Sequence, residues 1–361
     1  MQITLDALET DPHPLLAWLR AEQGPVCWAE PLNAWLVTGY REAVAVLRDS
    51  RTFTVDDPRF STARVTGPSM LSVDGAEHVR HRTPFTAGYR AETVQADLSA
   101  FTWAEASRLV TAIQPDGAGE LRRAVAGPLA VAVIARALGL DGTDPAAVLR
   151  WYDGIVAAVQ AAAAAPGEGR IPSRQFTELA AAVRATRRTP AGLTEDEYVA
   201  NAAVLMFGAI ETTEGMITNA LLHLLSTDTA PSQNAIEESL RLEPAAAIVD
   251  RYATADTGLG TARIRRGDQV TVSVSGANRD PAVFPGPDRF DPHRANAHRH
   301  LAFAHGPHYC LGAHLARLEA QAAVHTVLAS LENLTLAGAP EPRGLVFRKP
   351  AALPAIWTAP G

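Results

Sequence analysis

Apolar and polar positions recur with a helical period over much of the chain, interrupted early by one short strand. Residues 14–24 (PLLAWLRAEQG) and 41–50 (REAVAVLRDS) predict helices, and residues 34–40 (AWLVTGY) between them predict a strand. Residues 54–73 are polar and rich in turn-forming residues, which predicts an irregular loop. Over residues 77–224 almost every segment has the helical period, so this region is predicted to be nearly all helix.

The pattern changes in the last third of the chain, where β-branched residues and Gly/Pro turns replace the helical period. The segments predicted to be strands are 249–256, 260–276 and 345–358. One more helix is predicted from His314 to Leu331. The fold class is therefore mainly α with a minor β portion. No repeat and no Gly/Ser linker divides the sequence, which predicts one domain over residues 1–361.

One predicted helix is unusually long. Thr194 and Glu197 have the spacing of a capping box, in which each residue binds the backbone of the other at a helix start. No proline follows until after Ser226, so the helix would extend about 45–50 Å at 1.5 Å per residue. A helix of this length that is apolar on most faces is expected to lie in the middle of a domain.

The centre of this long helix is polar. Glu211, Thr212 and Thr213 interrupt an otherwise apolar run, and a buried charge is costly. Gly208 and Ala209 remove side-chain bulk one turn earlier, so another group could pack close to the backbone there. Two interpretations stay open: a narrow polar face at the surface, or a functional site.

Composition narrows the classes of function. The chain has 361 residues, of which 47% are hydrophobic, and a formal net charge of -7. This acidic balance gives no footprint for phosphate groups, so nucleic acid is not an expected partner. The positive charge comes almost entirely from arginine, since Lys349 is the only lysine. No apolar window is long enough to span a membrane, and the N-terminus lacks the pattern of a signal peptide. The two cysteines, Cys27 and Cys310, form no disulfide framework, and we expect a cytoplasmic protein.

Histidines and a cysteine are concentrated in residues 298–314 (HRHLAFAHGPHYCLGAH). The residues able to bind a metal are His298, His300, His305, His308, Cys310 and His314. A zinc site is one interpretation, although structural zinc sites usually have more than one thiolate. A second interpretation is a single thiolate ligand, and a third is a small buried apolar Cys310.

The residues around Cys310 favour the single thiolate. Cys310 precedes a predicted helix, whose N-terminal amides and dipole are expected to lower the thiol pKa. Gly306 and Gly312 allow the loop to fold tightly and to approach a flat cofactor, and Phe303 would give it an aromatic wall.

Residues 303–312 (FAHGPHYCLG) resemble the haem-binding loop of the cytochrome P450 family, F-x-x-G-x-[HR]-x-C-x-G. Further motifs of that family follow the same order along the chain. They are His78-x-x-x-Arg82, the oxygen-activating segment 208–213, the pair Glu238 and Arg241, Arg251, and residues 284–294 (FPGPDRFDPHR). The resemblance extends from about Asp11 to Ile356. It implies the P450 fold, with a long central helix over haem and small β-sheets.

The resemblance implies haem b as cofactor, with Cys310 as the axial ligand to its iron. Glu211 and Thr212 are implied to deliver protons to dioxygen. The residues implied to lie against haem are His78, Arg82, Arg251, His308, Phe303, Gly306, Leu311, Gly312, Ala209 and Ala316. A structural network is implied for Glu238, Arg241 and Arg289. The expected substrate pocket comprises Met70, Leu71, Val204, Phe207, Ala247, Ile248 and Ala351.

The function implied is that of a monooxygenase that oxidises a small organic molecule, expected to be a secondary metabolite, by hydroxylation, epoxidation or oxidative coupling. Electrons would come from a separate ferredoxin or flavodoxin, and the protein would be a monomer without nucleic-acid or membrane partners. The basic residues considered for docking the carrier are Arg80, His81, Arg294 and Arg317. Two alternatives remain open: a non-catalytic haem sensor, and a family member that performs an atypical cyclisation or coupling.

Overall fold

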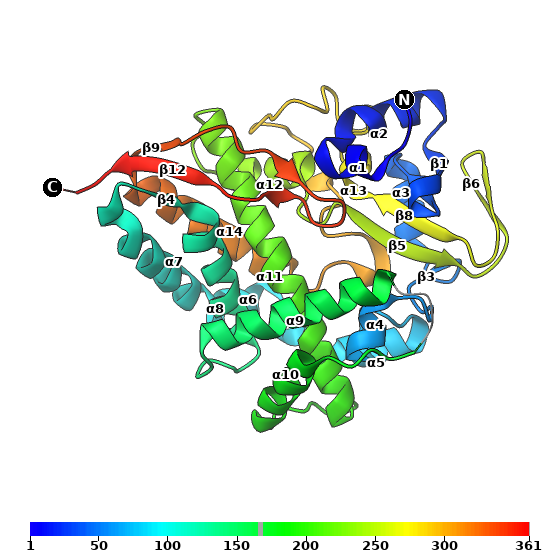
Figure 1. Cartoon of the computed structure of the whole chain (residues 1–361), viewed down its shortest axis with the longest axis horizontal. Coiled ribbons are helices and arrows are strands. Elements are labelled where there is room, and N and C mark those ends of the chain that lie inside the picture. Colours follow the sequence, from blue (N-terminus) through cyan, green and yellow to red (C-terminus); the bar gives the residue numbers. More distant parts are fainter. Residues whose placement is uncertain (165–168, 361) are drawn as a thin grey trace.

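The computed structural model describes residues 1–164 and 169–360, and its helices form the larger part of the molecule. Figure 1 shows the N-terminal helices beside a sheet at one end and most other helices at the opposite end. The α-helices are α1 (Leu5–Thr10), α2 (Pro12–Glu22), α3 (Tyr40–Arg48), α4 (Ser61–Thr66), α5 (Gly75–Thr86), α6 (Ala91–Asp97), α7 (Ser99–Ile113), α8 (Gly127–Ala137), α9 (Pro145–Ala164), α10 (Arg174–Ala185), α11 (Glu195–Ser226), α12 (Gln233–Leu242), α13 (Val274–Ala277) and α14 (Ala313–Ser330).

The strands are short. They are β1 (Val26–Ala29), β2 (Ala34–Val37), β3 (Phe53–Thr54), β4 (Ala118–Glu120), β5 (Ile248–Ala253), β6 (Thr257–Leu259), β7 (Ala262–Ile264), β8 (Gln269–Ser273), β9 (Glu332–Leu336), β10 (Pro342–Arg343), β11 (Lys349–Pro350) and β12 (Pro354–Thr358). The largest sheet has the order β1-β2-β8-β5-β3, and its only parallel pair among the described strands is β2 with β8. The others are β4-β12-β9, β10-β11 and β6-β7.

Helix α11 crosses the middle of the molecule (Figure 1) and packs against α8, α12 and α14. Its start is the predicted capping box: the backbone N–H of Glu197 donates to Thr194 Oγ1 at 3.2 Å, and the backbone N–H of Thr194 donates to Glu197 Oε2 at 2.8 Å. Its 32 residues extend about 48 Å at 1.5 Å per residue. The prediction of a long central helix is confirmed.

Helix α11 joins two hydrophobic cores. Its N-terminal half, to Ile210, packs in a core with α9 and α10. From Met216 onward the helix packs in a second core with α7, α8 and α14. The polar residues at its centre lie where one core gives way to the other, so they interrupt neither core.

The prediction of mainly α structure with small sheets is confirmed, although some local predictions differ from the structure, as two examples show. The predicted loop at 54–73 contains a helix, α4, whose backbone carbonyl at Arg64 accepts from Ile171 N–H at 2.8 Å. The region predicted to be helical at 77–224 contains β4, which pairs with β12. Both elements depend on partners more than 90 residues away, which a local pattern cannot reveal. None of the described helices has the length and apolarity to cross a membrane.

Candidate functional site

The cysteine loop is fixed by backbone geometry that few side chains tolerate. A 3-10 turn (Gly306–His308) lies between Phe303 and Cys310, and the Cys310 N–H donates to the Phe303 carbonyl at 2.9 Å. Gly306 has φ +73°, and a Cβ there would lie 2.5 Å from the carbonyl oxygen of Leu47 in α3. The loop therefore packs against α3 only because residue 306 is glycine.

The end of the loop places Cys310 just before α14. Gly312 is the N-cap residue of α14, and its carbonyl accepts from Ala316 N–H at 2.9 Å in the first turn. Leu311, Gly312 and Ala316 are half-buried, and Cys310 is exposed. The sulfur-bearing residue is therefore accessible at the start of α14, as the predicted haem loop requires.

The charge environment of Cys310 differs from the prediction in one respect. Burial among surrounding protein atoms raises the pKa of the Cys310 thiol, although the residue keeps exposed surface. The Gly312 N–H and the guanidinium groups of Arg82 and Arg317 act in the opposite direction without outweighing burial. The helix terminus therefore acts on the thiol pKa in the predicted direction, but burial outweighs it and the free thiol is not held as a thiolate. Binding to a cation is what would favour the thiolate.

Basic side chains from separate segments meet beside the cysteine loop. His308 Nε2 lies 2.8 Å from Asp74 Oδ1, and the ring of His78 lies 4.2 Å from that of His308. Burial, together with the neighbouring His308 and Arg82, lowers the pKa of His78 to about 4. His78 Nε2 is buried and has no hydrogen-bond partner among the described residues. A buried ring nitrogen without a partner is costly, which fits a bound polar group at this point.

Arg82 and Arg251 complete the basic group. Arg82 Nη2 donates to the Tyr309 carbonyl at 2.7 Å, which ties α5 to the cysteine loop. Arg251 is buried, and its Nη1 donates to the Asp250 carbonyl at 2.7 Å. Burial lowers the pKa of Arg251, while the charges of Asp74 and Asp250 act to raise it. The structure therefore brings together the four residues predicted to bind the haem propionates.

Helix α11 exposes its backbone at one point along an otherwise buried stretch. Gly208 is exposed, and a Cβ there would meet no heavy atom within 4 Å. Ala209, Glu211 and Thr212 next to it are half-buried, and Thr212 Oγ1 donates to the Gly208 carbonyl. The helix thus presents small residues and one hydroxyl at a place where a flat group can approach.

Glu211 has two partners that sequence reasoning missed. Lys349 Nζ lies 2.6 Å from Glu211 Oε1, and the Tyr152 hydroxyl donates to Glu211 Oε2. Burial raises the pKa of Glu211, but Lys349, Tyr152 and the charge of Arg122 outweigh it, so the pKa lies below its usual value. Only the status of Lys349 as the single lysine could have drawn attention to it.

The predicted structural network is correct for two of its three side chains. Glu238 and Arg241 are fully buried, with Arg241 Nε 2.8 Å from Glu238 Oε2. The third side chain is Arg294, whose Nε lies 3.0 Å from each Glu238 oxygen. The prediction of Arg289 is wrong: its side chain is 78% exposed and faces Asp291. The backbone turn from Gly286 to Arg289 directs it outward, and only its carbonyl accepts from the network.

The prediction of carrier docking is also wrong for two of its four residues, because both are buried. His81 is buried, where its Nδ1 lies 2.9 Å from Asn201 Nδ2, and Arg294 is buried in the network. Arg80 and Arg317 keep some exposure, but both are already paired with carboxylates. Arg80 binds Glu77 and Glu197, and Arg317 binds Glu237.

The predicted pocket residues fall into several groups. Met70 is buried, with its N–H donating to Asn201 Oδ1 at 2.9 Å; Leu71 is half-buried and Val204 buried. Phe207 packs against Tyr152 and Phe347, with ring centroids 6.3 and 6.0 Å away. Ala351 is exposed, and its carbonyl accepts from Arg122. Tyr152 and Phe347 are aromatic neighbours that the prediction omitted.

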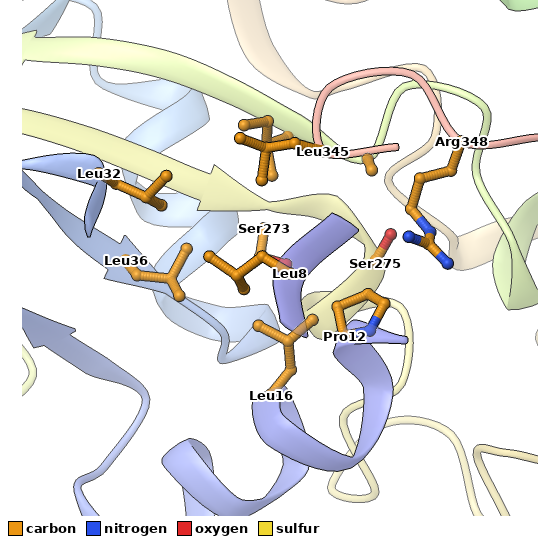
Figure 2. A pocket seen from close by; sticks show the side chains of 11 residues that line it. Leu8, Pro12, Leu16, Leu32, Leu36, Ser273, Ser275, Leu345 and Arg348 are labelled. Atoms are coloured by element: carbon orange, nitrogen blue, oxygen red, sulfur yellow. The ribbon is translucent and has the colours of Figure 1, made fainter. Parts of the chain in front are cut away.

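Ala247 and Ile248 line a different, small pocket at the N-terminal helices, of about 10 Å³, room for about one water. Figure 2 shows Leu8 and Leu16 of those helices facing Leu36 and Ser273. The lining contains no residue of the cysteine loop or of α11. These two residues were predicted for the substrate pocket, and this pocket is too small for an organic substrate.

The donor set fits haem better than zinc. In the part of the chain that the structure describes, no three His, Cys, Asp or Glu side chains are grouped as a metal site requires. Cys310 is exposed, His78 has an unpartnered buried nitrogen, and Arg82 and Arg251 supply positive charge. A thiol for iron and basic groups for two carboxylates match the chemistry of haem.

Comparison with known proteins identifies one family. The family model described as Cytochrome P450 matches residues 232–343. The chain is 34% identical over 360 residues to the cytochrome P450 monooxygenase PikC of Streptomyces venezuelae, covering 90% of this chain and 85% of that protein. It is 32% identical to the mycinamicin IV hydroxylase/epoxidase of Micromonospora griseorubida, covering 90% of each.

Solved structures give the same result for the fold. The crystal structure of CalO2 superposes with a TM-score of 0.87 at 27% identity, covering 99% of this chain and 98% of that one. The crystal structure of P450BioI in complex with an acyl carrier protein bearing hexadec-9Z-enoic acid gives a TM-score of 0.84 at 28% identity, covering 96% and 98%.

Proposed function

Because this chain belongs to the cytochrome P450 family, we propose that it oxidises a small secondary metabolite with dioxygen and electrons from a separate carrier. The chain is a haem b-dependent monooxygenase, as its curated relatives are. The substrate class follows from relatives named for mycinamicin IV and nocardicin C.

The observation that carries the proposal is the convergence of Cys310 with four basic side chains. Cys310 would bind the haem iron through its sulfur, and His78, Arg82, Arg251 and His308 would hold the propionates. Bound haem supplies the activation of dioxygen, which electron donation from a cysteine thiolate favours.

Residues of α11 would manage protons at this site. The Thr212 hydroxyl donates to the Gly208 carbonyl, so its oxygen remains able to accept a hydrogen bond from a water or a substrate hydroxyl. Glu211 is ionised at neutral pH, since its pKa lies below the usual value, and it can accept a proton and release it again. We assign Glu211 the role of a proton relay and Thr212 that of holding the water through which the proton passes.

Substrate would lie beside the aromatic side chains next to this relay. Phe207 packs against both Tyr152 and Phe347, with ring centroids 6.3 and 6.0 Å away. Val204 lies one turn before Phe207 on α11, and Met70 is held to α11 through Asn201. This apolar lining suits a small organic molecule with few charges.

We propose that the electron carrier is a ferredoxin or flavodoxin. Residues 1–361 of this chain would form one haem domain, and this protein would act as a monomer in the cytoplasm. Arg80 and Arg317 are the remaining candidates for docking, since both retain exposed surface. Reversing their charges should slow reduction and lower its salt dependence while substrate binding stays unchanged.

The visible spectrum tests the central claim. Purified protein, first ferric and then reduced under carbon monoxide, should give a strongly red-shifted Soret band that C310S loses. A colourless protein, or an imidazole-type band that C310S leaves unchanged, would contradict the thiolate ligand. Spin-state shifts on adding candidate compounds would then identify substrates. A haem sensor, in contrast, would bind haem and consume no reducing equivalents with any compound tested.

A further inference from the structure

The single lysine of the chain is buried between two carboxylates. Lys349, the first residue of β11, is only 8% exposed. Its Nζ lies 2.6 Å from Glu211 Oε1 and also binds Glu214 Oε2. Glu211 and Glu214 are three residues apart on α11, which puts both on one face of the helix. A half-buried and a buried carboxylate so close together would repel each other without a cation between them.

Other charged and polar groups around Glu211 come from α9 and from the turn before α8. The Tyr152 hydroxyl of α9 donates to Glu211 Oε2, and the exposed Asp153 acts on Tyr152 through its charge. Arg122, in a π-helical turn (Arg122–Ala126), lies 3.1 Å from Glu214 Oε2. The cluster thus contains two carboxylates and two cations, and Lys349 is the cation that contacts Glu211.

We propose that Lys349 is a positioning residue that keeps Glu211 ionised and oriented for proton delivery. This inference rests on the proposed function of Glu211. Arg122 is paired with Glu214 and acts on Glu211 only through its charge, whereas Lys349 contacts Glu211 directly. The Tyr152 hydroxyl donates a hydrogen bond but carries no charge, so it orients one carboxylate oxygen without compensating the charge.

A merely structural role is the competing explanation, since Lys349 also neutralises Glu214. The variant K349M leaves two carboxylates against one guanidinium, and loss of folding would not separate the two roles. The double variant K349M/E214Q removes one positive and one negative charge together. Its reference is E214Q, because both variants lack the Glu214 charge and release Arg122 from Glu214, so that only Lys349 differs between them. K349R is the control that keeps the positive charge.

The decisive measurement is the pKa of Glu211 in the haem-loaded protein, obtained by infrared difference spectroscopy as a function of pH. The carbonyl stretch of a protonated carboxylic acid is the signal, and its absence in E211Q assigns it to Glu211. Loss of an adjacent cation should raise this pKa by about one to three units in K349M/E214Q relative to E214Q. K349R should stay near the wild-type value. The same midpoint in folded K349M/E214Q and in E214Q would overturn the proposal.

Turnover provides an independent readout. If Glu211 must start ionised, the acidic limb of the pH profile for product formed per electron pair should move to higher pH in K349M/E214Q than in E214Q. In K349R it should stay at the wild-type position. An infrared shift without any change in this profile would show that Lys349 sets the charge of Glu211 but that proton delivery does not use Glu211. That result would overturn the proposed role of Glu211, whereas no shift in either measurement would overturn the role of Lys349.

Discussion

Arg294 Nε lies 3.0 Å from both carboxylate oxygens of Glu238, and Arg241 binds the same two oxygens through Nε and Nη2. Arg241 also donates to the Pro287 and Arg289 carbonyls, and Arg294 donates to the Pro285 carbonyl. The three charged side chains are buried, and together they tie α12 to the irregular segment that leads to the cysteine loop. The position of the loop therefore depends on Arg294.

The first prediction separates the two arginines of this segment. Removing one partner of a buried ion pair costs about 3–5 kcal/mol, because the other charge stays buried. R294M should lose that much stability and bind less haem. R289M should change stability by less than about 0.5 kcal/mol, because its side chain is 78% exposed. Urea unfolding and the ratio of haem to protein measure both effects. Equal losses in the two variants would contradict the assignment.

The choice between these arginines illustrates what the sequence could not decide. The segment 284–294 contains both, and the resemblance led to Arg289, whereas the structure places Arg294 on Glu238. Which one reaches Glu238 depends on the path of an irregular turn, in which Gly286 adopts φ +58°. Local periodicity carries no information about such a path. The long helix, in contrast, depends on its own capping box and apolar pattern, and it was predicted to within a residue.

The partners of Glu211 were unpredictable for a related reason. Lys349 and Tyr152 are 138 and 59 residues away along the chain from Glu211, and neither belongs to a motif near it. Motifs identified Glu211 and Cys310 because the chemistry of each is carried by adjacent residues. Contacts between distant segments, which fix the charge of Glu211, exist only in the folded chain.

A second prediction concerns the two glycines that flank Cys310. G306A should be strongly disruptive, because φ is +73° and the new Cβ would lie 2.5 Å from the Leu47 carbonyl. Left-handed backbone and overpacking together cost roughly 2–5 kcal/mol. G312A should be tolerated, since its Cβ would lie 4.0 Å from Cys310 Sγ. Haem content after purification measures the difference. Normal haem content in G306A would show that the loop can move away from α3.

A third prediction tests the hydroxyl at Thr212. T212V keeps the shape and removes the hydroxyl that donates to the Gly208 carbonyl. Product per electron pair should fall about 10-fold or more, as expected for a group that assists proton transfer. More hydrogen peroxide should be released, while the substrate-induced spin shift stays unchanged. T212S retains the hydroxyl and should recover most of the lost product. Equal yields from T212V and wild type would contradict the relay.

The last prediction concerns acid stability at a site away from the haem. Glu243 is buried, with oxygens 2.8 Å from His13 Nε2 and 2.9 Å from Arg348 Nε. Burial raises the pKa of Glu243, but His13, Arg348 and Arg279 outweigh it and lower it from 4.5 to about 2. A carboxyl with a lowered pKa stabilises the fold fully at pH values above its pKa in the unfolded chain. It loses that effect as the pH falls through its pKa in the folded protein.

E243Q should therefore be less stable than wild type by on the order of 3 kcal/mol at pH 7. The gap should narrow below pH 4.5 and close near pH 2. Urea unfolding at successive pH values measures it, and the exposed E341Q should show no such gap at any pH. A gap for E243Q that stays constant down to pH 3 would mean that the carboxylate charge contributes nothing to the stability of the native state.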